Sequence, residues 1–75
     1  MREDFRTFLK MLTQAEKRLR EAQDMLNQAH LYYLKHRLAV SDTANKMLYE
    51  IYVALGCLRR LLGVALEVLT REAYG

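Results

Sequence analysis

Few residues in this sequence could do chemistry: one cysteine, two histidines and a hydroxyl group near one of the histidines. His30 and His36 are six positions apart, which on a helix is too wide for both rings to bind one metal ion. Neither histidine has a carboxylate three or four positions away to orient its ring. Ser41 follows His36 by five residues and is better explained as a helix cap than as a nucleophile. We therefore predict no metal site and no catalytic group.

Cys57 lies between Gly56 and Leu58 in the most apolar part of the chain, so we expect a buried and inert thiol. Gly56 and Gly63 form no phosphate-binding loop, because nothing strand-like precedes them. We expect these glycines to relieve crowding where another helix passes. The sequence thus predicts a protein that is not an enzyme and that has no cofactor and no small-molecule substrate.

Basic residues are the remaining candidates for a binding site. Lysine and arginine total 12 against 9 acidic residues, a net charge of +3. This surplus permits nucleic-acid binding but is weaker than the concentrated charge of a dedicated binder. The residues available for such contacts are Arg18, Arg20, Lys35, Arg37, Arg59 and Arg60. We favour the alternative in which the arginines of this band pair with Glu16, Glu21 or a second subunit.

The elements that carry these residues are two long helices. Apolar residues recur at 5, 8, 12, 15, 19, 22, 26, 29 and 33, and again at 48, 51, 55, 58, 62, 65 and 69. Spacing of three and four is typical of coiled-coil helices and lacks the alternation of strands. We predict one all-α domain over 1–75: a helix over about 3–39, a turn at 40–42 and a helix over about 43–72, with Ser41 as its N-cap. So short a connection makes the two helices an antiparallel hairpin.

The second helix has more apolar surface than one neighbour can cover. Its apolar arc spans roughly 200°, about twice the stripe that a single partner helix buries. We therefore predict a homodimer that forms an antiparallel four-helix bundle. The predicted dimer interface consists of Ala54, Leu58, Leu61, Ala65 and Val68. The alternatives are a different protein in the same place, or a monomer whose first helix folds back as a third helix.

The end of the first helix is apolar almost all round, with exposed positions at Leu31, Tyr32, Leu34 and Leu38. Tyrosine rings with polar ends are favoured at interfaces, so this end is either a dimer contact or a site for a partner protein.

The predicted function is a non-enzymatic protein–protein interaction module, an adaptor, regulator or inhibitor. A nucleic-acid-binding dimer and a chaperone subunit that completes its bundle with a partner's helix are the alternatives. In general form, the chain resembles the small bacterial or phage-encoded helical hairpins that act as adaptors, secretion chaperones or inhibitors.

Location is predicted from charge placement. Arg59 and Arg60 stand at the centre of the apolar stretch 51–69, which argues against a membrane-spanning helix. The charged start of the chain has no apolar run after it, so we expect no secretory signal. A reduced Cys57 fits the cytoplasm, and we predict that location with no membrane partner.

Overall fold

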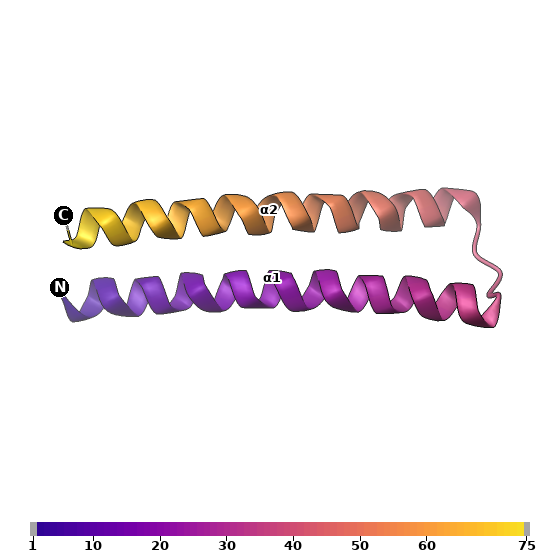
Figure 1. The fold of residues 1–75 in the computed structure, drawn as a ribbon, viewed down its shortest axis with the longest axis horizontal. Helices are drawn as coiled ribbons and strands as arrows, with labels where there is room; N and C mark the ends of the chain where they lie inside the picture. Colours follow the sequence, from indigo (N-terminus) through magenta and orange to yellow (C-terminus); the bar gives the residue numbers. More distant parts are fainter. Residues whose placement is uncertain (1, 75) are drawn as a thin grey trace.

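The computed structural model describes residues 2–74 as two long helices joined by a short connection. Helix α1 spans Glu3–His36 and helix α2 spans Asp42–Tyr74. The two helices run antiparallel along the whole molecule, with both chain ends at one end and the connection at the other (Figure 1). The predicted all-α helical hairpin is confirmed over the described residues.

Capping explains where α2 begins. The Ser41 hydroxyl oxygen accepts a hydrogen bond from the Ala44 amide at 3.1 Å, and the Ser41 carbonyl accepts one from Asn45 at 2.9 Å. Asp42 places a carboxylate in the first turn, where the helix dipole favours negative charge. The predicted role of Ser41 as N-cap is confirmed.

The end of α1 comes three residues earlier than the predicted residue 39. Arg37 adopts the left-handed conformation, with φ 50° and ψ 47°. The Leu38 amide then donates to the Tyr33 carbonyl at 3.1 Å and the Arg37 amide to the Leu34 carbonyl at 3.4 Å. These are the two hydrogen bonds of a Schellman motif, which stops a helix by satisfying its last carbonyl groups. The connection is therefore 37–41, longer than the predicted turn 40–42.

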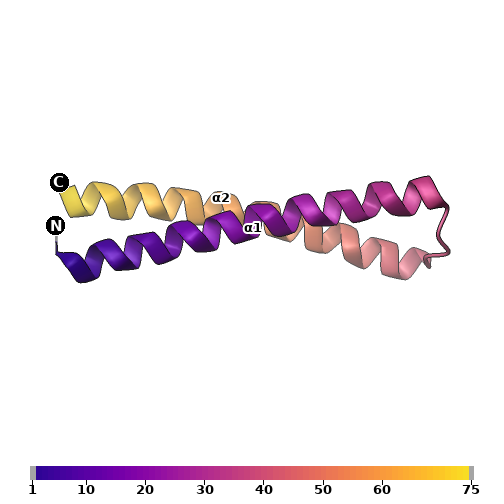
Figure 2. The same cartoon turned by 90° about the horizontal axis from the view of Figure 1, so that it is seen from below.

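The helices cross at a shallow angle near their middles (Figure 2) and form a rod of 53 × 16 × 14 Å. Half-buried side chains on the facing sides of the two helices form the seam. On α1 these are Phe5, Leu9, Leu12, Glu16, Leu19, Gln23, Leu26 and Tyr33; on α2 they are Tyr52, Leu55, Arg59, Leu62, Leu66, Leu69 and Ala73. The spacing of three and four residues is the predicted one, typical of two-helix packing.

Alternate positions of the predicted seam are wrong on both helices. On α1 the structure leaves Phe8, Ala15, Ala22 and Ala29 exposed, and Leu9, Glu16 and Gln23 take the places of the first three. On α2 it leaves Leu48, Ile51 and Leu58 exposed, and Tyr52 and Arg59 take the places of Ile51 and Leu58. The physical reason is that the seam of α1 includes two polar residues, which an apolar periodicity cannot detect.

Within residues 2–74 no apolar side chain is buried, and Gly56 is the one buried residue. The chain exposes 6319 Å², whereas a compact monomer of its mass exposes about 4,800 Å². Its radius of gyration is 16.9 Å, against about 11 Å for a compact domain of this length. A single hairpin thus leaves most of its apolar surface in contact with water.

Candidate interaction surface

A stripe of exposed apolar side chains follows each helix beside the seam. On α1 the stripe contains Phe8, Met11, Ala15, Ala22, Met25, Ala29 and Tyr32. On α2 it contains Met47, Ile51, Ala54, Leu58, Leu61, Ala65 and Val68. Each stripe repeats at three and four residues, so each is a second coiled-coil pattern beside the first.

The two stripes lie on the same side of the hairpin. Ala22 on α1 and Leu58 on α2 each come one residue before a seam position, Gln23 and Arg59 respectively. Both helices are right-handed and run in opposite directions, so positions just before these equivalent seam residues flank the same side of an antiparallel pair. We call this side, made of both stripes, the apolar face.

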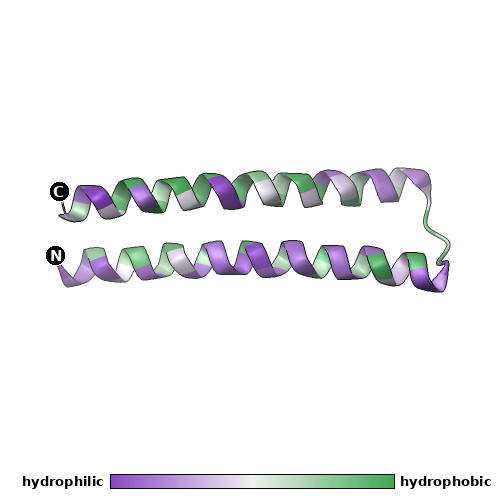
Figure 3. Cartoon of the chain, viewed as in Figure 1, coloured by the Kyte–Doolittle hydropathy of each residue, from purple (hydrophilic) through white to green (hydrophobic). Residues whose placement is uncertain are grey.

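Large side chains on the apolar face are well exposed. Leu61 is 67% exposed, Leu58 52% and Met25 62%. Hydrophobic residues dominate the middle of α2, whereas the middle of α1 is mainly hydrophilic (Figure 3). The hydrophilic part of α1 lies mostly on the opposite side of the hairpin, which we call the polar face. One charged residue, Arg18, interrupts the α1 stripe.

All five residues of the predicted dimer interface, Ala54, Leu58, Leu61, Ala65 and Val68, fall on the apolar face. They are exposed except Ala65, which is half-buried. The α1 half of this surface was not predicted, because its exposed alanines were expected in the contact with α2. The signal was present in the positions of Met11 and Met25, which continue the alanine stripe at helical spacing.

The middle of the seam holds a polar cluster. The Gln23 side chain donates from Nε2 to the Tyr52 carbonyl at 3.4 Å and accepts a hydrogen bond at Oε1 from Arg59 at 2.9 Å. Arg59 Nε also lies 3.9 Å from Glu16 Oε1. A polar group within a helical seam fixes the register and orientation of the two helices, because a slipped pairing leaves it without partners.

The same cluster accounts for Gly56. A Cβ atom at this position would come within 2.7 Å of Gln23 Nε2. Glycine therefore gives the Gln23 amide room beside α2, as predicted for a close approach. Apart from the adjacent residues and backbone of α2 itself, nothing lies within 4 Å of the place where a Cβ of Gly63 would be, so the hairpin does not explain Gly63.

The basic residues do not form one band. Arg20 Nη2 donates to Glu16 Oε2 at 2.6 Å, and Arg18 Nη1 lies 3.7 Å from Glu21 Oε2. The hydrogen bond and charge of Glu16 raise the pKa of the Arg20 guanidinium above its ordinary value. The pairing of arginines with Glu16 and Glu21, which we favoured over nucleic-acid binding, is thus present within the chain. Arg18 and Arg20 lie on opposite sides of α1, since two residues turn a helix by about 200°.

The remaining members of the proposed nucleic-acid set are spread along the rod. Arg60 lies on α2, where its Nη2 donates to Cys57 Sγ at 3.4 Å. Lys35 and Arg37 are at the connection, the latter just beyond the end of α1. The structure therefore gives no continuous positive surface from these six residues.

Cys57 is exposed in the hairpin, so its predicted burial is wrong for the single chain. Its position on α2 borders the apolar face rather than the seam, which explains the difference. Among residues 2–74 no three histidine, cysteine or acidic side chains lie close enough together to hold a metal ion.

The apolar residues predicted for partner binding divide between the two sides of the hairpin. Leu31 and Leu34 share the polar face, whereas Tyr32 belongs to the apolar face and stacks on His36 with ring centroids 4.1 Å apart. Leu38 lies in the connection beyond the left-handed residue and is exposed. The four residues do not form a single patch, because α1 ends before Leu38 and its turns separate the others.

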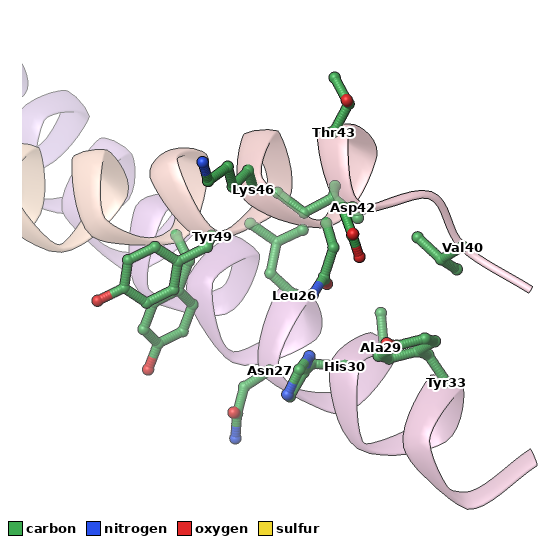
Figure 4. A pocket seen from close by; sticks show the side chains of 13 residues that line it. Leu26, Asn27, Ala29, His30, Tyr33, Val40, Asp42, Thr43, Lys46 and Tyr49 are labelled. Atoms are coloured by element: carbon green, nitrogen blue, oxygen red, sulfur yellow. The ribbon is translucent and has the colours of Figure 1, made fainter. Parts of the chain in front are cut away.

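The two helices leave a groove next to the connection. It has a volume of about 860 Å³ and is lined by residues of α1, α2 and the connection (Figure 4). Tyr33, Tyr49 and Tyr52 supply aromatic surface, and His30 and Asn45 supply polar groups. The exposed Leu48 shows that the seam is open here. This groove, which the sequence analysis did not predict, adds aromatic surface to the end that carries Leu31 and Leu34.

Comparison of the chain with protein-family models, curated proteins and solved structures finds no match. Between Arg2 and Tyr74, neither helix combines the length and the apolar character that crossing a bilayer requires.

Proposed function

We propose that this protein is a non-enzymatic protein–protein interaction module that acts as a homodimer. The observation that carries the proposal is the exposed apolar face, which includes side chains from both helices along the full rod. Contiguous apolar surface of this extent is rare on soluble monomers and is typical of interaction sites. In this proposal the apolar face holds the two copies together, and the end of the rod near the connection contacts a partner protein.

The area of the hairpin supports self-association. The chain exposes about 1,500 Å² more than a compact monomer of its mass. A standard protein–protein interface buries about 800 Å² on each partner, and obligate dimers bury more. A second copy on the apolar face would thus bring the exposed area of each chain close to that of an ordinary globular protein.

The partner site of this proposal lies at the end near the connection. Leu31, Leu34 and Leu38 are exposed there, beside the groove with its three tyrosines. Aromatic residues in a concave apolar site are the usual anchors for a partner's side chains. Adaptors, regulators and inhibitors share this arrangement of one face for assembly and another for the target.

Leu61→Glu tests the proposed assembly. Wild-type protein is expected to sediment as a dimer, and a glutamate in the middle of the apolar face is expected to weaken dimerisation at least tenfold, because it places an unpaired charge in an apolar contact. Val53→Glu is the matched control, since Val53 is an exposed apolar residue of α2 outside the apolar face. Helix content measured by circular dichroism verifies that each variant folds.

Three results would overturn the homodimer. The first is a wild-type chain that is monomeric and fully folded across the micromolar range, and the second is a Leu61→Glu variant that dimerises like wild type. The third is a wild-type chain that is aggregated or partly folded, which would favour the chaperone subunit that completes its bundle with another protein's helix.

A further inference from the structure

We infer that the second copy docks on the apolar face with its connection at the same end of the rod, so that α1 of each copy covers α2 of the other. This inference rests on the proposed homodimer and adds its geometry. Two hairpins can meet face to face about a twofold axis in two ways that keep all neighbouring helices antiparallel. The axis runs either along the helices, with both connections at one end, or across them, with the connections at opposite ends.

Side-chain size is compatible with both connections at one end. The α1 stripe alternates large residues with alanines at 15, 22 and 29, and the α2 stripe combines Ile51, Leu58 and Leu61 with Ala54 and Ala65. With the connections at one end, Ala22 and Met25 of α1 face Leu58 and Ala54 of the partner subunit, so a small residue meets a large one at the middle of the interface.

The positions of residues along the rod axis agree with the pairing of α1 against the α2 of the other copy. Gln23 of α1 lies level with the stretch of α2 between Tyr52 and Arg59, to which it is hydrogen-bonded. When the connections are at one end, the axis along the rod preserves these heights between copies. Ala22 then stands level with Ala54 and Leu58 of the partner subunit. Ala15 and Ala29 lie seven residues, about two helical turns, to either side.

Charge separates the two arrangements. Arg18 is the one charged residue within the α1 stripe, and it lies next to the midpoint of α1. Were the connections at opposite ends, α1 would cross its own copy at this midpoint and bring two Arg18 side chains together, which is unfavourable in an interface. With the connections at one end, the two copies of α1 are diagonal neighbours. Glu21, 3.7 Å from Arg18, then holds its guanidinium at the rim.

The consequence for the partner site is that the dimer has two grooves at one end rather than one at each end. Leu31 and Leu34 of the two copies then lie on the outward polar faces, on opposite sides of this one end. A target that reaches both copies gains affinity without new types of contact.

Distances between spin labels test the arrangement. In a Cys57→Ser background, Lys35→Cys places a label near the connection, on a side of α1 away from both seam and apolar face. The expected interlabel distance in the dimer is set by the width of the bundle, since each hairpin is only 16 × 14 Å across. Connections at opposite ends would give a distance close to the 53 Å length of the rod.

Lys17→Cys in the same background is the matched control, because a label near the midpoint of α1 gives a short distance in either arrangement. A short distance at both sites supports the inference. A short distance at residue 17 with a long one at residue 35 overturns it and leaves the homodimer intact. A monomeric mass for both labelled chains and for unlabelled wild type overturns the homodimer and the inference together.

Discussion

Arg37 is the only residue between 2 and 74 with a positive φ angle. A side chain in this conformation brings its Cβ close to the backbone, and glycine occupies most such positions after helices for that reason. Within the described range 2–74, no acidic side chain forms an ion pair with this arginine that would offset the cost. Its place in the connection is therefore set by the need to end α1 with the two Schellman hydrogen bonds.

Arg37→Gly is expected to raise the free energy of unfolding by about 0.5–1 kcal/mol, because relief of the left-handed strain exceeds the added chain entropy of glycine. Urea denaturation at a fixed protein concentration measures the shift. Lys35→Gly is the control: it lies within α1 and should lower the same free energy by about 1 kcal/mol. A stability loss in Arg37→Gly would show that the arginine side chain itself stabilises the connection.

At the scale of the elements, the two glycines of α2 differ in what surrounds them. Gly63→Ala is expected to stabilise the protein by about 1 kcal/mol, since a methyl group there meets open space and alanine favours the helix. Gly56→Ala carries the same helical gain but displaces the Gln23 amide from Tyr52 and Arg59. We expect little or no net gain from it.

Thermal melting of both variants, compared with wild type at equal concentration, checks this difference. Equal stabilisation by the two substitutions would show that the Gln23 hydrogen bonds contribute nothing to the seam. A loss of stability in Gly63→Ala would instead show that a helix approaches this position, which the inferred dimer leaves uncovered.

The sequence predicted which residues form helices better than it predicted which side of each helix faces the other. Apolar periodicity and the Ser41 cap identify the two helices, because local hydrogen bonding and hydrophobic spacing decide them. The choice of seam depends on Glu16, Gln23 and Arg59, whose polar atoms satisfy one another only after the helices meet. Which side of each helix forms the seam therefore depends on tertiary contacts between polar groups, and a pattern of apolar residues contains no information about them.

The candidate interaction surface could likewise be predicted only in part. The α2 half of the apolar face could be predicted, since the arc of apolar residues exceeds what one neighbour covers. The α1 half could not, because its alanines fit a seam as well as a surface. The groove beside Tyr33 and Tyr49 depends on how far the helices separate near the connection, which sequence spacing does not specify.

For the molecule as a whole, stability and assembly are expected to be one process. A hairpin without a buried apolar side chain among its described residues has little core of its own, so in the proposed dimer the second copy would supply much of the burial that stabilises the fold. The melting temperature should therefore rise with protein concentration. Differential scanning calorimetry over a hundredfold concentration range measures this, with Leu61→Glu as the control whose melting is lower and insensitive to concentration. A wild-type melting temperature that stays constant would contradict the coupling.

The two helix ends opposite the connection lie side by side in Figure 1, which makes the order of the helices exchangeable. A permuted gene that encodes residues 42–74 first, then a short glycine–serine linker, then residues 2–36, would give the same pair of helices with the closure moved to the other end of the rod. The region around Leu34 and Tyr49 would then carry two free chain ends, to which a fluorophore or an affinity handle could be attached directly. Such a chain would report on events at that end without any change to the side chains of either helix.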